Sequence, residues 1–339
     1  MINILNKKAN SSQTIISFLL SKLKKKSFNF FDVGARNGSF ILPEDYTIHT
    51  IMYGFEPNQE EYEKLISNNT DANKHGIIES RFKEKKFFNT ALYEKKCNRK
   101  IYITNGPGAV TLMGPAHKKI SVNLSRKFDK DLDYFEKVQK LKEVKSVKCD
   151  NLDALWSDNE EYIDFIKLDT EGTELNILKG AEKLLRKKKI LMIKSEFFHT
   201  PYYKVHSLLG HQQVYLDKLG YRLVFVERDH YGYSWKKSNV NEEYDKRYQY
   251  AGDAYYIPDP DLNTLNQEQF IRLGIINIAL GFKASGINFL RSSKKFNNEE
   301  IFKIEKLAST PSLLRRITNF WKKIPSMVSI FLKLNHNHD

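Results

Sequence analysis

The chain is poor in cysteine. Its two cysteines, Cys97 and Cys149, show no CxxC spacing and no accompanying histidine cluster in 339 residues. This argues against a disulfide framework and against a structural zinc site. The sequence therefore indicates a reduced, cytoplasmic setting.

Long apolar runs are also missing. No stretch reaches the roughly 18 to 20 consecutive apolar residues that a membrane-spanning helix requires. The apolar segment 14–20 continues directly into the lysine-rich segment 22–26 without a small-residue cleavage site. It is therefore predicted to be a short amphipathic helix rather than a signal peptide.

Positive charge is abundant, with a formal net charge of +14. Such a balance attracts acidic partners, which include nucleic acid, anionic lipid and a charged glycan or nucleotide. Residues 282–339 contain eleven Lys and Arg against four Asp and Glu, so about half of the excess lies in this tail. A solvated basic surface accounts for the same composition, so charge alone does not identify a partner.

Short apolar runs alternate with helical patterns from residue 28 to about 257. This alternation predicts an α/β fold in which crossover helices join the strands of a mostly parallel sheet. We expect seven strands, the last two forming an antiparallel hairpin, at 28–33, 50–56, 85–93, 162–169, 190–197, 221–227 and 253–258.

The same pattern predicts three regions. An N-terminal helix occupies 1–27, the α/β domain covers 28–261, and a basic helical C-terminal extension covers 262–339. The domain carries an insertion at about 97–160. Within the insertion we expect a hairpin at RKIYIT, a glycine-rich bend at 105–110 and a charged helix near 125–143.

The first strand leads into a glycine-rich turn, FNFFDVGARNGSF. Gly34 permits a positive φ and Gly38 permits close approach of a following segment, although a tight turn without any ligand explains both. Glu56 ends the second strand 18 residues after Gly38, where a carboxylate accepts hydrogen bonds from ribose hydroxyls. Arg36 stands where the NAD fingerprint expects glycine, so the pattern favours another nucleoside cofactor.

These segments carry a family resemblance. DVGARNG, YGFEPNQEEYEKL, NTALY, VKCDNLDAL and IDFIKLDTEGTELNILKGAEKLL follow one another in order. Over roughly residues 28–257 the chain resembles the FkbM-type family of S-adenosylmethionine-dependent methyltransferases, and KLDTEGTELNILKGA at 167–181 is the most specific part. The resemblance implies a Rossmann-like class I methyltransferase fold. It also implies methylation of hydroxyl groups on sugars or on secondary metabolites such as macrolides.

The resemblance also implies roles for individual residues. The methionine and ribose portion of S-adenosylmethionine would lie against Asp32, Gly34, Ala35 and Gly38, the ribose would be held by Glu56, and the adenine would lie beside Asn89 and Ala91. Arg36, Pro57 and Asp169 complete the expected cofactor-binding set. Arg36 stands where many relatives have a smaller or neutral residue, so it reaches either toward the cofactor carboxylate or away from it.

The transferred methyl group is already activated in this cofactor, so the protein has to align an acceptor oxygen and take up its proton. Asp169, Glu171, Glu196 and His199 follow the fourth and fifth strands and are the predicted catalytic residues. Asp169 and Glu171 have the better functional case, because they end a strand at the ligand edge of the sheet, whereas nearby Glu174 and Glu182 suit the first turns of helices. The aromatic residues around His199 fit a sugar platform or lid packing equally well. A metal-assisted alternative uses Asp169, Glu171 and Glu196 as ligands of a divalent cation.

The main prediction is a cytoplasmic O-methyltransferase acting on a hydroxyl of a carbohydrate or glycan-like acceptor. One alternative is an RNA ribose methyltransferase, because Lys167, Asp169, Lys194 and Glu196 match the residue types of its Lys-Asp-Lys-Glu set. The sequence contains no NPPY-like tetrapeptide, which argues against methylation of exocyclic base amines. Another alternative is a methyltransferase fold that binds ligands without catalysis.

The C-terminal segment 311–334 has apolar residues at helical spacing with basic residues between them. Such a helix either lies on the anionic inner membrane surface as a peripheral contact, or packs on its own domain or across a homo-oligomer. The sequence leaves both alternatives open.

Overall fold

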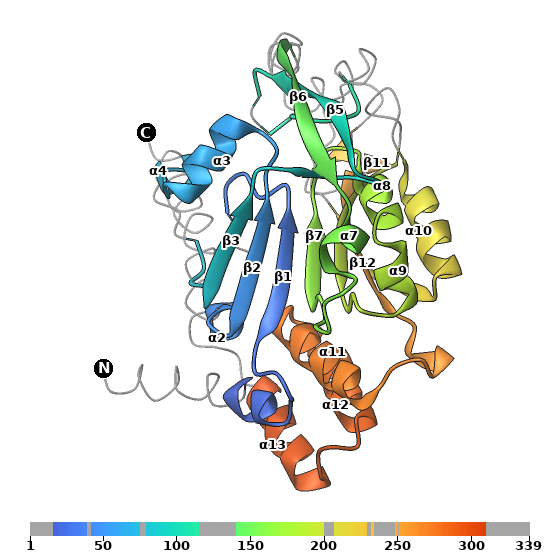
Figure 1. Ribbon diagram of the computed structural model, residues 1–339. Coiled ribbons are helices and arrows are strands. Elements are labelled where there is room, and N and C mark those ends of the chain that lie inside the picture. Colours follow the sequence, from blue (N-terminus) through green and yellow to red (C-terminus); the bar gives the residue numbers. More distant parts are fainter. Residues whose placement is uncertain are drawn as a thin grey trace, which may run out of the picture.

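The computed structural model describes residues 16–38, 42–74, 79–106, 108–114, 140–199, 207–228, 232–233, 248–249 and 251–309. Its centre is a seven-stranded sheet in the order β3-β2-β1-β7-β8-β12-β9 (Figure 1). The strands are β1 (Phe28–Val33), β2 (Thr50–Phe55), β3 (Glu84–Phe88), β7 (Phe165–Leu168), β8 (Ile193–Phe198), β9 (Tyr221–Arg228) and β12 (Ala251–Pro258).

Strand directions agree with the predicted fold class. The pairs β1–β2, β2–β3, β1–β7 and β7–β8 are parallel, whereas β12 runs antiparallel to both β8 and β9. The α/β fold with a mostly parallel sheet and a final antiparallel pair is therefore confirmed. In such a sheet the carboxyl ends of the parallel strands share one edge, which is where ligands bind.

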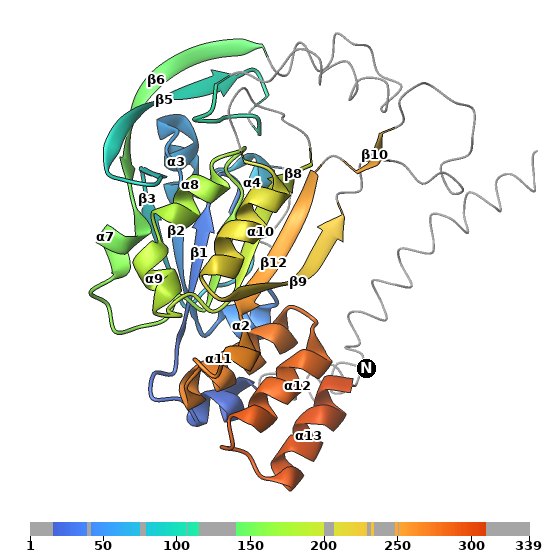
Figure 2. The same cartoon turned by 90° about the vertical axis from the view of Figure 1, so that its right-hand side faces the viewer.

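Both faces of the sheet are buried, which explains why its strands read as apolar runs. In β1, Phe28 and Phe30 belong to one apolar cluster, whereas Phe31 and Val33 belong to another, as the period of two in a strand requires. The second cluster is closed by four helices, which Figure 2 shows together: α7 (Leu152–Trp156), α8 (Glu174–Lys179), α9 (Glu182–Arg186) and α10 (Leu209–Lys218).

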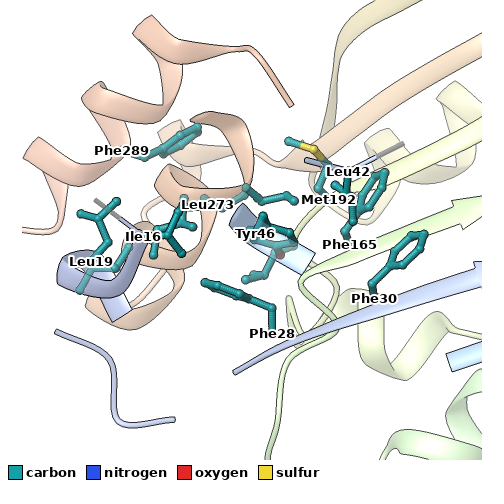
Figure 3. Close-up of a cluster of buried hydrophobic side chains, with 14 of the residues drawn as sticks. Ile16, Leu19, Phe28, Phe30, Leu42, Tyr46, Phe165, Met192, Leu273 and Phe289 are labelled. Atoms are coloured by element: carbon teal, nitrogen blue, oxygen red, sulfur yellow. The ribbon is translucent and has the colours of Figure 1, made fainter. Parts of the chain in front are cut away.

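The first cluster joins the sheet to elements from both ends of the chain. Helical residues 16–21 pack there with α11 (Gln267–Ala279), α12 (Lys283–Ser292) and α13 (Asn298–Ser309), below the amino ends of the strands (Figure 1). Figure 3 shows Ile16 and Leu273 close to Phe28 and Tyr46, whose rings stack with centroids 4.6 Å apart. The predicted helical C-terminal region is therefore present, while the division of the chain into domains stays a prediction.

A buried ion pair attaches α11 to the sheet. Arg272 donates from Nη1 to Oδ1 of Asp164 at 2.9 Å, and the two side chains are 3% and 0% exposed. The guanidinium also donates to the backbone carbonyls of Lys25 and Ser27, and the backbone N–H of Asn29 donates to Asp164. This network links both ends of the described chain to the start of β7.

The segment 311–334 lies outside the described residues, so its predicted membrane or dimer contact stays a prediction. Within the described ranges, no helix combines the length and apolar character needed to cross a membrane. The remaining short elements are α2 (Glu44–Thr47), α3 (Gln59–Ile66), α4 (Asp71–Lys74), η2 (Pro260–Leu262) and the pair β10 (Gly232–Tyr233) and β11 (Tyr248–Gln249).

A small second sheet stands over the carboxyl edge of the main one. It has the order β4-β6-β5, from β4 (Ala91–Leu92), β5 (Cys97–Thr104) and β6 (Leu141–Asp150), and Figure 2 shows β5 and β6 arching over that edge. The register places Cys97 opposite Cys149, and both thiols are free. A pairing between residues this far apart along the chain gave no sequence signal.

Two expectations for this region are wrong. The strand expected at 85–93 is two strands in different sheets, because the chain leaves the main ladder after Phe88 and Asn89 donates instead to the carbonyl of Glu56. The helix expected near 125–143 is a strand where it is described, at 141–143, because pairing with β5 overrides the helix propensity of its Lys and Glu residues. Residues 125–139 lie outside the described ranges.

Replacing Arg272 tests the anchoring of α11. Arg272→Met leaves Asp164 buried without its cation, which costs about 3–5 kcal/mol of unfolding free energy. Urea titration followed by circular dichroism measures this loss. Arg291→Met is the matched control, because Arg291 pairs with Glu305 at a half-exposed position and its loss leaves stability nearly unchanged. Equal stability of the two variants would contradict the anchoring role.

Candidate active site

A cavity of about 210 Å³ lies at the carboxyl edge of the sheet, under the small second sheet. Many predicted site residues line it, namely Gly34, Arg36, Gly38, Glu56, Pro57, Ala91, Asp169 and Glu171. The lining does not include Asp32, Ala35, Asn89, Glu196 or His199. The structure therefore brings most of the predicted cofactor residues together, with the predicted catalytic residues divided between the wall and its surroundings.

Gly34 follows β1 and packs closely against the residue after β7 at the cavity wall. Its φ is +87°, and a Cβ at this position would come 1.9 Å from the carbonyl oxygen of Asp169. Any other residue would push these strand ends apart. Gly38 also has a positive φ, of +80°, and a Cβ there would come 2.8 Å from the carboxyl carbon of Glu79. Close packing against the backbone thus requires glycine at position 34, whereas at Gly38 the positive φ is the constraint, because the Glu79 side chain can move.

Glu56 follows β2 and is 6% exposed. Its Oε1 accepts a hydrogen bond from the N–H of Asn58 at 2.8 Å, and burial raises its pKa to about 7. Asn58 in turn caps α3 by accepting from the N–H of Glu60, as its place before that helix predicts. Asn89 donates to the carbonyl of Glu56 at 3.0 Å, so it holds the backbone that carries this carboxyl group.

Arg36 reaches away from the strand ends toward two helices. Its Nε donates to Oε2 of Glu61 in α3 at 3.1 Å, and its Nη2 donates to Oδ2 of Asp71 in α4 at 3.0 Å. The side chain therefore forms part of the cavity wall while its charge is matched by two carboxylates. Its predicted place beside the cofactor carboxylate stays a prediction.

Lys167 connects the ends of β1 and β7 through charge. Its Nζ lies 3.3 Å from Oδ1 of Asp32 and 3.0 Å from Oδ2 of Asp169. Burial opposes the charged form, but the two carboxylates raise the pKa of Lys167 above its usual value. Burial raises the pKa of Asp32 to about 6, against the effect of Lys167. Asp32 is completely buried, so it does not line the cavity, and its contact with Lys167 helps to hold the strand ends beside it.

The loop after β7 is held by Glu174. Its Oε1 accepts hydrogen bonds from the N–H and the hydroxyl of Thr170, both at 2.9 Å, and from the N–H of Gly172 at 3.2 Å. Glu171 lies between them with a left-handed φ of +57°. Because Glu174 opens α8 and binds the loop at once, its carboxyl group fixes where Asp169 and Glu171 lie.

Glu196 lies in β8, behind the cavity lining. Its Oε2 is buried and has no hydrogen-bond partner in the described part of the chain. Burial and the carboxylates of Glu171 and Asp169 raise its pKa well above the usual range. His199 follows the same strand, is exposed, and contacts Phe197 edge-on with ring centroids 5.0 Å apart.

The described residues offer no set of ligands for the metal-assisted alternative. Across the residues that the structure describes, no group of three His, Cys, Asp or Glu side chains is arranged to hold a metal ion. Asp169 is paired with Lys167 instead. The carboxylates proposed as ligands from the sequence therefore do not form a metal site there.

Sequence reasoning missed one side of the cavity. Ile101, Val110, Thr111 and Leu112 line it from β5 and the adjoining turn. Thr111 donates from its hydroxyl to the carbonyl of Glu171 at 2.7 Å, which fastens this turn to the loop after β7. The glycine-rich bend at 105–110 was the available signal, because it marks a tight return of the chain after β5.

Comparison with known proteins identifies a family signature. Residues 32–223 match the sequence model of the Methyltransferase FkbM domain. No curated protein matches the chain significantly. The matched segment includes all the described residues that line the cavity, which run from Val33 to Thr173.

Solved structures give weaker likeness. The magnesium protoporphyrin IX methyltransferase of Synechocystis PCC 6803, solved with bound SAM, is 9% identical with a TM-score of 0.33, covering 76% of this chain and 86% of that chain. TrmK of M. capricolum, solved with S-adenosyl-homocysteine, is 11% identical with a TM-score of 0.31, covering 86% and 96%. Scores this low add nothing to the strand order itself.

The role of Glu174 as a loop scaffold is testable with two substitutions. Glu174→Ala removes the acceptor from buried N–H groups and is expected to cost about 1–3 kcal/mol of unfolding free energy. Glu174→Gln keeps an amide oxygen that accepts the same bonds, so its stability stays close to that of the wild type. Thermal unfolding of both variants measures the difference. An equal loss of stability in both would show that the charge of Glu174, and not its hydrogen-bond acceptance, holds the loop.

Proposed function

Because the chain belongs to the FkbM methyltransferase family, we propose that it transfers a methyl group from S-adenosylmethionine to a hydroxyl of a carbohydrate or glycan-like acceptor. The observation that carries the proposal is the position of Glu56. This buried carboxyl group lines the cavity at the end of β2, where a carboxylate binds ribose hydroxyls.

The residues of the cavity fit this cofactor. Glu56 offers acceptors for two hydroxyl groups, and Asp169 and Glu171 add acidic groups suited to the positive charges of an ammonium and a sulfonium. Gly34 keeps the wall free of side chains beside Asp169. Ala91 and Leu92 supply apolar surface for the adenine ring.

When bound, S-adenosylmethionine supplies an activated methyl group on sulfur. The chain has to orient the acceptor hydroxyl and to accept its proton. We favour Glu171 as the base because it lines the cavity, whereas Glu196 lies behind the lining with its Oε2 buried. Asp169 is occupied by Lys167, and exposed His199 stays a second candidate.

The charges beside this site favour a carbohydrate over RNA as acceptor. Lys167 and Lys194 lie opposite each other on β7 and β8, as the RNA ribose alternative requires. However, Lys167 is paired with Asp32 and Asp169, and Lys194 lies 2.9 Å from Oδ2 of Asp253. Lysines neutralised in this way offer little charge to a phosphate backbone.

Cofactor binding is tested by titrating S-adenosylhomocysteine, the demethylated product, into the full chain by calorimetry. Deprotonated Glu56 accepts from the ribose hydroxyls, so binding lowers its pKa from about 7 and releases a proton. Affinity is therefore constant above pH 7 and falls below it, by at most about tenfold per pH unit.

Glu56→Gln removes this pH dependence and weakens binding, whereas Glu60→Gln, a change at an exposed helix position, preserves both. Absence of binding to folded wild-type protein would instead support the non-catalytic alternative. Binding with the same affinity in Glu56→Gln would move the ribose site elsewhere.

Acceptor class is tested by transfer of labelled methyl from S-adenosylmethionine to a panel of glycans and to RNA. We expect label on a glycan hydroxyl, and label on RNA ribose would overturn the acceptor assignment. Glu171→Gln should lower the rate of transfer by about 10²- to 10⁴-fold, because it removes the group that accepts the hydroxyl proton. An unaltered rate would assign the base to another residue.

A further inference from the structure

A second cavity, of about 520 Å³, adjoins the first. It lies between the small second sheet and the amino-terminal ends of α8 and α10. Its polar and aromatic lining consists of Tyr93, Arg99, Tyr102, Asn176, Ser207 and His211. Among the described residues that line it there is no Asp or Glu, although the first cavity is rich in them.

Arg99 is the cation of this cavity, and no carboxylate in the described part of the chain forms an ion pair with it. Its guanidinium carbon lies 4.2 Å from the centre of the Tyr93 ring, which holds it by a cation–π contact. Its Nε is buried and has no hydrogen-bond partner among the described residues. The guanidinium is thus held by ring stacking and not by any carboxylate that the structure describes, and where it lines the cavity its positive charge is available to an anion.

A second unmatched atom lies in the same wall. The hydroxyl oxygen of Ser207 is buried and also lacks a partner within the described ranges. His211 uses Nδ1 to accept the N–H of Leu208 at 3.0 Å, which leaves Nε2 as the nitrogen available to donate. Polar side chains that are distant in sequence, that of Arg99 and those of Ser207 and His211, therefore line one cavity.

The two cavities share a wall. Leu112 lines both of them, and Tyr102 of the second cavity bridges Thr111 of the first through two backbone hydrogen bonds of 2.9 and 3.3 Å. Thr111 also holds the carbonyl of Glu171 beside the first cavity. A molecule in the second cavity thus lies one side chain away from the predicted methyl-donor site.

We propose that the methyl acceptor binds in this second cavity and is an anionic carbohydrate, whose carboxylate or phosphate is held by Arg99. The inference rests on the proposed function and names the acceptor more narrowly. A guanidinium binds either anion with paired hydrogen bonds, and tyrosine rings offer flat apolar surface to a sugar ring. The net charge of +14 draws such an acceptor toward the chain.

Three probes separate the two anion types from a neutral sugar. Methyl β-D-glucuronide carries a carboxylate, glucose 1-phosphate carries a phosphate, and methyl β-D-glucoside carries neither. Each is titrated by calorimetry into the full chain saturated with S-adenosylhomocysteine. At least one anionic probe should bind about 10- to 100-fold more tightly than the neutral one, as a charged hydrogen bond predicts.

Arg99→Gln should reduce that preference to the level of the neutral sugar without changing S-adenosylhomocysteine affinity, and Arg99→Lys should restore part of it. Arg222→Gln is the matched control, because Arg222 pairs with Asp259 and Asp261 and lines neither cavity. Ser207→Ala removes the other unmatched atom and breaks no bond of the described residues, so it tests the cavity if Arg99→Gln does not fold.

Equal binding of neutral and anionic probes overturns the proposal, and so does an anionic preference that survives in Arg99→Gln. Failure of all three probes to bind at millimolar concentration overturns it as well. Failure of S-adenosylhomocysteine to bind would contradict the proposed function instead. The probes are therefore also titrated into the chain without it, so that the second cavity is judged separately.

Discussion

The carboxyl edge of the sheet depends on how closely β1 and β7 approach each other. The N–H of Asp169 donates to the carbonyl of Val33 at 3.1 Å. The carbonyl of Asp169 leaves no space for a side chain at position 34, where the chain has glycine. Lys167 joins the same strand ends by its contacts with Asp32 and Asp169. Because backbone and side chains fix the same distance, the cavity wall is set before any ligand enters.

Charge is distributed unevenly over this frame. The chain is strongly basic as a whole, yet the first cavity is lined by Glu56, Asp169 and Glu171, with the half-buried Glu196 behind it. Buried carboxyl groups close to one another bind protons more readily. A cation entering this region relieves that repulsion, which suits a positively charged methyl donor, while the second cavity beside it presents Arg99 instead.

The sequence predicted what is local or carried by a motif. Strand periodicity gave the sheet, and Gly34, Glu56 and Asp169 meet at one cavity as their positions at strand ends required. What it missed depends on distant pairing. The predicted charged helix near 125–143 runs into the first three residues of β6, which are a strand because β5 pairs with them. Tyr93, Arg99 and His211 share a cavity only through the folded chain. Asn89 belonged to a recognised motif, yet its amide supports the backbone of Glu56.

The small second sheet contributes to both cavities but to none of the contacts that fix β1 against β7. Residues of β5 and the turn after it form one wall of the first cavity and part of the second. Sequence change at Arg99 or Tyr102, which line the second cavity and not the first, therefore alters the shape and charge of the second cavity without disturbing Gly34, Lys167 or Glu174. Under the proposed assignment, acceptor preference is therefore set by positions that can be exchanged without rebuilding the strand ends beside the methyl donor.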